Sequence, residues 1–166
     1  MARFAEHDEF KTSILYSVEI LKNLRFLSIA GYASMVLALI PMAYFRTIFS
    51  RSLPVVIIQI LAVALMVWAR ITFGSRSFHY AANPTQGGLV TSGPYKFVRH
   101  PIYAAIALFV LAGVTANTHW MNILLLAVIV LGIGLRIYCE ERLIRQEYPE
   151  YDEYAKRTRR IIPFVF

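Results

Sequence analysis

Four long apolar stretches, separated by short polar segments, dominate the pattern of this chain. They cover about residues 26–45, 54–73, 101–116 and 120–138. A hydrocarbon core about 30 Å thick needs about 20 residues of helix, so each stretch is long enough, or nearly so, to cross a membrane. The sequence therefore predicts an all-α polytopic integral membrane protein with about four transmembrane helices. Only Asn117–His119 separates the last two stretches, which predicts a tight antiparallel hairpin.

A different pattern precedes the first apolar stretch, over about residues 8–23. Phe10, Ile14, Val18 and Leu21 recur at helical spacing, with charged residues between them. This pattern predicts an N-terminal amphipathic helix on the membrane surface or, equally, a cytoplasmic extension of the first transmembrane helix.

Polar and apolar residues mix again after residue 138. The segment Tyr148–Tyr154 predicts a short helix, and an apolar end follows at Ile161–Phe166. A solvated tail is rarely so rich in Tyr, Ile and Phe, so this tail is expected to fold back as a lid. The basic run from Arg157 to Arg160 is interpreted as a contact with lipid headgroups.

Composition supports a single membrane domain over residues 1–166. The chain is 58% hydrophobic and 16% charged, with a mean hydropathy of +0.55, which is too apolar for an average soluble domain. Its net charge of +7 comes from basic residues that flank the apolar stretches and form no aromatic-interleaved patch. Membrane lipids are therefore the expected partners, and nucleic acid is not.

The distribution of basic residues predicts the orientation. Of the 17 lysines and arginines, all but Arg46 and Arg51 fall on one side of the predicted spans. Both termini and the central loop are therefore expected in the cytoplasm. The compact length favours a bacterial inner membrane over the endoplasmic reticulum. The N-terminus shows no recognisable cleavable signal, so the first span is expected to direct insertion.

No metal site is expected. Cys139 is the single cysteine, which excludes an intramolecular disulfide and a cysteine-based metal site. His7, His79 and His119 show no metal-ligand spacing.

Two polar groups of residues adjoin the last two apolar stretches. Gly93-Pro94-Tyr95 marks a turn. The start of the third stretch carries hydrogen-bond donors and a titratable group, supplied by Arg99, His100 and Tyr103. Pro101 fits the first turn of the helix predicted there. Arg99 and His100 could equally be plain headgroup anchors.

The second group lies where the fourth stretch leaves the membrane. Arg136 and Glu140 are four residues apart, as are Glu141 and Arg145, so each pair shares a helix face. Glu140 and Glu141 point about 100° apart, so we expect one to face a pocket and the other to pair outward. A solvated helix start with ordinary ion pairs is the simpler alternative.

Taken together, these motifs closely resemble the isoprenylcysteine carboxyl methyltransferase family and its bacterial and archaeal relatives. The resemblance covers about residues 70–166. It rests on the order and spacing of Gly93-Pro94-Tyr95, Arg99-His100-Pro101, Tyr103, Glu140-Glu141, Leu143, Tyr151, Tyr154, Arg157 and Ile162-Pro163. Ala105 departs from the family pattern, which usually has Gly there. Phospholipid N-methyltransferases and certain membrane sterol reductases look similar in this region.

The resemblance implies a membrane enzyme that binds S-adenosylmethionine in a cytoplasmic pocket, built from about residues 74–103 and 136–166 and closed by the helical tail. A lipophilic small-molecule or lipid substrate would enter from the bilayer. Carried over by position, the cofactor-binding residues are Gly93, Pro94, Tyr95, His100, Pro101, Tyr103 and Glu140. Glu141, Arg136 and Arg99 are the catalytic candidates.

The acceptor and the reaction stay open at this point. Carboxyl methylation of an isoprenylcysteine-like acceptor needs no base, and Arg136 or Arg99 would orient the carboxylate. A lipid amine needs a base, for which Glu141 or His100 is the candidate. NADPH-dependent reduction of a lipid double bond and a non-catalytic membrane-binding module are the alternatives.

Overall fold

The structure is a computed structural model that describes residues 2–74 and 88–162, with side chains described at Leu15 and from residue 18 onward. The described residues form helices and no strand, apart from an isolated parallel bridge between Val98 and Arg159. In chain order the elements are α1 (Ala2–Tyr44), α2 (Leu53–Phe73), the 3-10 turn η2 (Gly93–Lys96), α3 (Pro101–Ala116), α4 (Trp120–Glu147) and α5 (Tyr151–Arg157). The all-α prediction is confirmed.

The described part of the chain holds three helical stretches that are long and apolar enough to cross a membrane. They are Val18–Tyr44, Leu53–Phe73 and Trp120–Glu147. The fourth helix, α3, has 16 residues and is therefore about 24 Å long, shorter than a typical hydrocarbon core. The count of four spans stays a prediction, although α3 occupies the range predicted for it.

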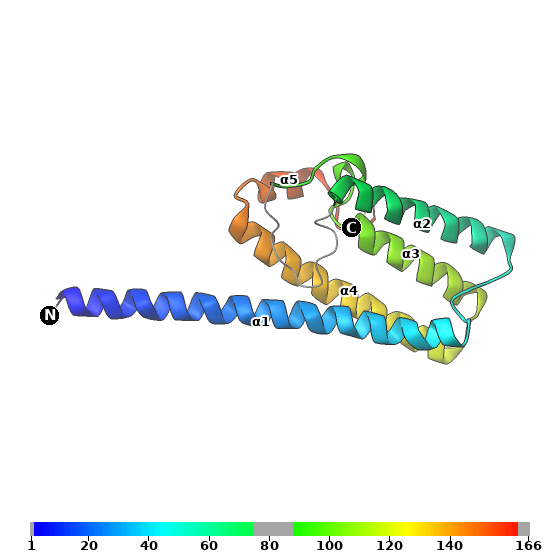
Figure 1. Cartoon of the computed structure of the whole chain (residues 1–166), viewed down its shortest axis with the longest axis horizontal. Helices are drawn as coiled ribbons and strands as arrows, with labels where there is room; N and C mark the ends of the chain where they lie inside the picture. Colours follow the sequence, from blue (N-terminus) through cyan, green and yellow to red (C-terminus); the bar gives the residue numbers. More distant parts are fainter. Residues whose placement is uncertain (1, 75–87, 163–166) are drawn as a thin grey trace.

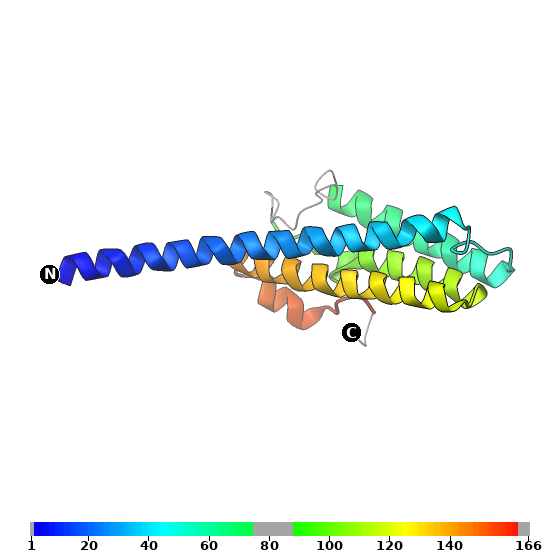
Figure 2. The same ribbon diagram turned by 90° about the horizontal axis from the view of Figure 1, so that it is seen from below.

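The N-terminal helix is one uninterrupted element. The segment at about residues 8–23 is continuous with the first span inside α1, which matches the second of its two sequence interpretations, a helix extension. In both ribbon views this end of α1 projects well beyond the other helices (Figures 1 and 2). The amphipathic pattern falls mostly on side chains outside the described ones.

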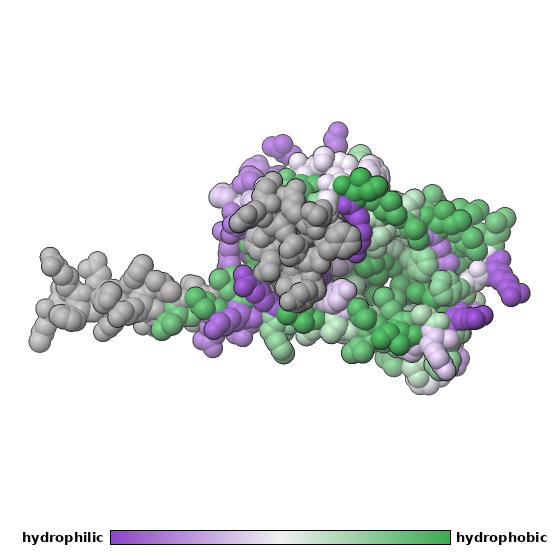
Figure 3. Space-filling view, viewed as in Figure 1, coloured by the Kyte–Doolittle hydropathy of each residue, from purple (hydrophilic) through white to green (hydrophobic). Residues whose placement is uncertain are grey.

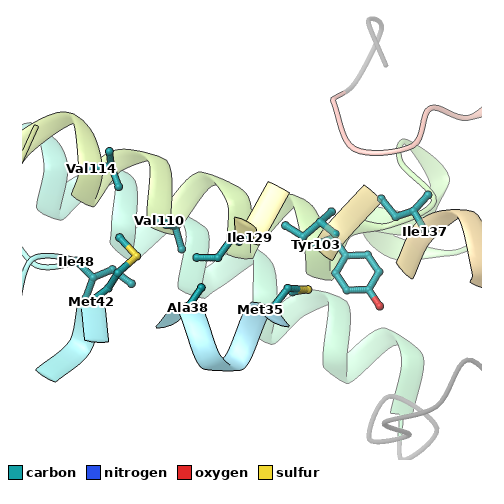
Figure 4. Packing of buried hydrophobic residues seen from close by; sticks show 10 residues of the cluster. Met35, Ala38, Met42, Ile48, Tyr103, Val110, Val114, Ile129 and Ile137 are labelled. Carbon is teal, nitrogen blue, oxygen red and sulfur yellow. The ribbon is translucent and has the colours of Figure 1, made fainter. Parts of the chain in front are cut away.

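The helices pack mainly as two pairs, α1 along α4 and α2 along α3. A buried apolar cluster joins these pairs, with residues from α1, α3, α4 and the turn after α1 (Figure 4). Gly31 and Gly132 bring α1 and α4 together, because a Cβ on Gly132 would lie 2.8 Å from the Gly31 carbonyl oxygen. Close crossing of membrane helices at small residues gains van der Waals contact along the backbones.

The turn that links α1 to α2 is held by side-chain amides. Asn117 Nδ2 donates to the carbonyls of Thr47 and Phe49, both at 2.9 Å, and Gln59 Nε2 donates to that of Ile48 at 2.7 Å. Asn117 belongs to the predicted short link between α3 and α4, which is present. From this end of the bundle α4 diverges from α3 (Figure 1).

The surface of the bundle is largely apolar. Leu37, Ile71 and Leu131 are exposed on α1, α2 and α4. The space-filling view shows hydrophobic residues over the bundle, and hydrophilic residues near α5 and at the opposite tip (Figure 3). This arrangement suits helices that face lipid, with polar groups at both ends.

Candidate functional site

Three segments meet where α3 begins: the residues before it, the polar end of α4 and the C-terminal tail. The helix that contains the fourth apolar stretch extends beyond residue 138, and α4 ends at Glu147. The tail forms α5, as predicted, and then runs beside the start of α3. The amides of Arg99 and His100 donate to the carbonyls of Arg159 and Arg160, at 2.7 and 2.9 Å.

Glu141 lies at the centre of this meeting point. Its side chain is only 3% exposed, and it accepts from Arg99 Nε at 3.2 Å and from the Arg160 guanidinium at 3.2 Å. Arg145, one helical turn further along α4, approaches it to 3.9 Å. A buried carboxylate with guanidinium groups from three segments connects those segments to each other.

Arg99 fastens the tail to the bundle. Besides its bond to Glu141, the guanidinium donates to the carbonyl oxygens of Ala155, at 2.9 Å, and Thr158, at 2.6 Å. The planar, forked donor set of arginine makes such a three-way contact possible, which the single ammonium of lysine does not reproduce.

Glu140 has a different set of partners on the neighbouring face of α4. Tyr103 Oη donates to its Oε1 at 2.6 Å, and Arg136 Nε lies 3.0 Å from the same oxygen. Arg136 Nε also donates to Tyr103 Oη. The Glu140 side chain is 18% exposed, so it is more open than Glu141. The expectation that one of the two carboxylates pairs outward is wrong, since both join interior networks.

His100 contacts both carboxylates. Its Nδ1 lies 3.6 Å from Glu140 Oε2, and its Nε2 lies 3.5 Å from Glu141 Oε1. The second approach lacks the geometry of a hydrogen bond, and Nε2 is a buried atom with no hydrogen-bond partner in the described part of the chain. A buried polar atom without a partner calls for a ligand or a water molecule.

A partly open cavity of about 80 Å³ lies beside His100. Its walls come from the end of α2, from residues 88–100, from the end of α4 and from α5. They include Phe73, Leu89, Tyr95, Arg99, His100, Ile144, Tyr148, Tyr151 and Tyr154. Tyr151 Oη is a second buried atom without a partner among the described residues. Since small-molecule sites usually measure about 300–1,000 Å³, this cavity admits only part of a nucleoside-sized ligand in the present conformation.

The turn η2 supplies one wall of the cavity. Gly93 begins it with φ +56°, and a Cβ there would lie 2.6 Å from Thr72 Oγ1, so glycine suits the position on both grounds. Tyr154 Oη donates to the Tyr95 carbonyl at 2.7 Å, which ties α5 to this turn. Burial raises the pKa of Tyr154 to about 12 and the pKa of Tyr95 further above its ordinary value. Both phenols therefore stay neutral donors near pH 7.

The structure brings all ten predicted site residues into this region. Tyr95, Arg99 and His100 line the cavity. Tyr103, Arg136, Glu140 and Glu141 form the networks around His100, without lining the cavity themselves. Gly93 and Pro94 shape the turn η2, and Pro101 occupies the first turn of α3. Ala105, the departure from the family pattern, is buried within α3.

Sequence reasoning assigned other roles to some residues of this region. The sequence placed Tyr151 and Tyr154 in a short helix and gave neither a site role, yet both line the cavity. Their spacing of three on a short helix is the signal that both could face one partner. Arg160 turns inward to Glu141, whereas the basic run containing it was expected to contact headgroups. Within the described residues, no group of three or more His, Cys, Asp or Glu side chains could hold a metal ion.

Comparison with known proteins adds a family and two relatives. Residues 55–146 match the isoprenylcysteine carboxyl methyltransferase family. The chain is 39% identical over 80 residues to the nickel-cobalt-cadmium resistance protein NccN of Alcaligenes xylosoxydans xylosoxydans, an alignment covering 45% of this chain and 36% of that protein. It is 36% identical over 88 residues to the cobalt-zinc-cadmium resistance protein CzcN of Cupriavidus metallidurans, covering 51% and 39%. The matched part is thus well under half of each relative. No solved structure matches significantly.

Proposed function

Because this chain belongs to the isoprenylcysteine carboxyl methyltransferase family, we propose that it is an integral membrane methyltransferase that uses S-adenosylmethionine to methylate a lipophilic acceptor. One observation carries the proposal. His100 Nε2 and Tyr151 Oη are two buried polar atoms with no hydrogen-bond partner among the described residues, and both residues line the same cavity. A polar ligand in that cavity would satisfy both atoms.

The residues around the cavity fit this cofactor chemically. S-adenosylmethionine supplies a methyl group on a positively charged sulfur, and it carries an ammonium group and ribose hydroxyls. His100 Nε2 and Tyr151 Oη offer two polar contacts from residues that line the cavity. Glu140, which lies next to His100 outside the cavity lining, adds a partly exposed carboxylate for a cationic or hydroxyl group. Phe73, Leu89 and Ile144 provide apolar wall that excludes water.

The networks on α4 suggest separate roles for the two carboxylates. Glu141 is occupied by three guanidinium groups, so it is a poor proton acceptor, and we assign it the role of holding the tail. Glu140 and His100 are left to contact ligands. Methyl transfer is an in-line displacement, so the main task of these residues is to orient the reactants and keep water out.

The same assignment is compatible with two acceptor classes, which differ in the residues they require. A carboxylate acceptor attacks the methyl group without losing a proton, and Arg136 is the cation that would orient it. A lipid amine requires a base, and with Glu141 occupied the candidates are His100 and Glu140. The names of the two relatives refer to metal resistance and do not identify an acceptor.

Calorimetric titration of the purified protein in detergent tests the cofactor. S-adenosylhomocysteine should bind with micromolar affinity, whereas NADPH should not bind, and the reverse result would overturn the methyltransferase proposal in favour of a reductase. His100→Ala should weaken S-adenosylhomocysteine binding at least tenfold. The matched control is His119→Ala, which removes a histidine that caps the start of α4 at the other end of the bundle.

Transfer of labelled methyl groups to a panel of prenylcysteine, phospholipid, thiol and amine acceptors tests the reaction itself. Product in one acceptor class supports an enzyme and names its substrate. Failure of both S-adenosylhomocysteine and NADPH to bind would support the non-catalytic membrane module instead.

A further inference from the structure

We propose that Tyr32 on α1 is a positioning residue that covers the Arg136–Glu140 pair on its lipid side, and that the polar group of the acceptor reaches this pair by displacing the Tyr32 ring. The proposal rests on the proposed methyltransferase function for the identity of the incoming molecule. Tyr32 lies outside residues 55–146, the part that matches the family, so the family match assigns it no role.

The geometry that motivates the proposal is a stacked guanidinium. The centre of the Arg136 guanidinium lies 5.2 Å from the centroid of the Tyr32 ring. Arg136 is 5% exposed, whereas Tyr32 is 44% exposed. A half-exposed ring therefore lies against a nearly buried charge. Tyr32 belongs to the candidate membrane span Val18–Tyr44, which in a bilayer would face lipid.

Arg136 also contacts residues of α3 and α4. Its Nε contacts Glu140 and Tyr103 Oη, and its guanidinium also lies 6.0 Å from the centroid of the Tyr103 ring. Two tyrosine rings thus lie against one guanidinium. The inner ring, Tyr103, is 9% exposed and hydrogen-bonded to Glu140, whereas the outer ring is neither buried nor hydrogen-bonded among the described residues. Of the two, only the outer ring can move without breaking a hydrogen bond.

The backbone beneath Tyr32 is fixed closely to α4. Its neighbour Gly31 lies so near that a Cβ there would be 3.6 Å from the Arg136 amide nitrogen and 3.0 Å from the Gly132 carbonyl oxygen. The helix contact therefore holds the start of the side chain in place, while the ring at its end is half-exposed. A movable ring on a fixed backbone is suited to covering a charge when no ligand is present.

This entry side is distinct from the cavity. Tyr32, Tyr103, Arg136 and Glu140 do not line the cavity, and His100 is the residue that both lines the cavity and contacts Glu140. Methyl transfer brings nucleophile and leaving group to opposite sides of the methyl group. A donor at the cavity side and an acceptor at the Tyr32 side of His100 would meet this requirement.

Chemical modification of arginine tests whether the Tyr32 ring shields Arg136, and it requires neither cofactor nor catalysis. Purified protein in detergent is treated with phenylglyoxal, and the modified arginines are identified by mass spectrometry of peptides. Tyr32→Ala should raise the modification rate of Arg136 at least fivefold, and Tyr32→Phe, which keeps the ring, should leave it within twofold. An unchanged rate at Arg136 in Tyr32→Ala would overturn the proposal.

The matched control is Tyr138→Ala. Tyr138 is 52% exposed, and its ring stacks at 5.3 Å with the guanidinium of Arg142, outside the Glu140 network. This variant should raise modification at Arg142 only. An equal increase at Arg136 would show that a general loosening of α4 causes the effect, and that result would also overturn the proposal.

Protection by single-chain amphiphiles tests whether a polar headgroup reaches Arg136. Palmitate or hexadecylamine should slow the modification of Arg136 at least threefold, and hexadecane should not. Lack of protection by both amphiphiles would overturn the acceptor part of the proposal. S-adenosylhomocysteine affinity should stay within twofold in Tyr32→Ala, whereas the Michaelis constant for the acceptor should change more than fivefold. Loss of cofactor binding in the wild type would instead contradict the proposed function, and the modification test would still stand.

Discussion

Glu140 and Glu141 are adjacent on α4, yet the regions around them differ in almost every physical respect. Glu141 is nearly inaccessible and is bound by arginines from the start of α3, from α4 and from the tail. Glu140 is partly exposed and is bound by one arginine, one phenol and His100. The comparison indicates that one region joins segments of the chain, whereas the other leaves a charged group partly exposed, as the proposed contact with a ligand requires.

The difference arises from the helix itself. Successive residues of an α-helix point about 100° apart, so neighbouring side chains face different elements. Glu141 faces the returning tail, and Glu140 faces Tyr103 of α3. Five substitutions test this division, from the largest expected effect to the smallest.

Glu141→Gln should be the most damaging change. It leaves the buried Arg99 and the partly buried Arg160 without their shared anion, and breaking a buried ion pair costs about 3–5 kcal/mol. Thermal unfolding in detergent, followed by tryptophan fluorescence, should show a large drop in the melting temperature. Glu147→Gln, the same exchange at an exposed position at the end of α4, is the control. Equal melting temperatures of the two variants would refute the joining role of Glu141.

Arg99→Lys should release the tail. Lysine keeps the charge but cannot contact Glu141 and the carbonyls of Ala155 and Thr158 together, which should cost about 2–3 kcal/mol. Limited trypsin digestion should then cut the tail at Lys156 or Arg157 several times faster than in the wild type. Arg142→Lys, at an exposed position of α4, should leave the rate unchanged. A tail equally resistant in both variants would contradict the anchoring by Arg99.

Glu140→Gln should affect binding more than folding. The charge that would hold a cationic cofactor is lost, so S-adenosylhomocysteine affinity should fall about tenfold or more, which is about 1.4 kcal/mol. Calorimetric titration measures the affinity, and the melting temperature should drop less than in Glu141→Gln. If Glu140→Gln lowered the melting temperature more than Glu141→Gln does, Glu140 and not Glu141 would be the carboxylate that holds the fold together.

Tyr154→Phe should have a modest effect. It removes the hydrogen bond to the Tyr95 carbonyl that ties α5 to η2, worth about 1 kcal/mol. The melting temperature should fall slightly, and the affinity for S-adenosylhomocysteine should fall two- to fivefold because Tyr154 and Tyr95 line the cavity. Tyr138→Phe, at an exposed position of α4, is the matched control. A stability loss as large as that of Arg99→Lys would show that this bond, too, holds the tail.

Asp152→Asn should have the smallest effect. Asp152 accepts from Arg145 at 2.9 Å, but the aspartate side chain is 67% exposed and the arginine side chain 40% exposed. Exposed ion pairs contribute about 0–1 kcal/mol, so the melting temperature should barely change. A drop in melting temperature as large as that of Glu141→Gln would mean that the exposed Arg145–Asp152 pair stabilises the protein as much as the buried Glu141 network does.

Much of the fold could be predicted from the chain alone. The ends of α2 and α3 agree with the predicted spans to within a residue, because runs of apolar residues and prolines at first turns define them locally. The polar end of α4 was predicted as well. Charges after residue 138 indicated an exit from the membrane, and the pairs Arg136–Glu140 and Glu141–Arg145 implied that the helix continues beyond it, as α4 does to Glu147.

The sequence predicted which residues belong to the candidate site better than it predicted how they contact one another. The motifs identified His100, Tyr103, Glu140 and Glu141 as neighbours in function, and the structure brings them together. Tyr32 and Arg160 could not be found that way. Tyr32 reaches Arg136 from α1, more than 100 positions earlier in the chain, and nothing local to an aromatic residue in an apolar helix indicates a distant guanidinium.

The sequence by itself determined the helical class, the apolar lengths that suit a bilayer and the set of polar residues at one end, because these depend on residue type and spacing along the chain. Only the tertiary structure decided which carboxylate joins the tail and which lies next to His100, and that an aromatic ring of α1 covers Arg136. Such partnerships depend on how separate helices are rotated against each other, and packing across the whole bundle fixes that rotation.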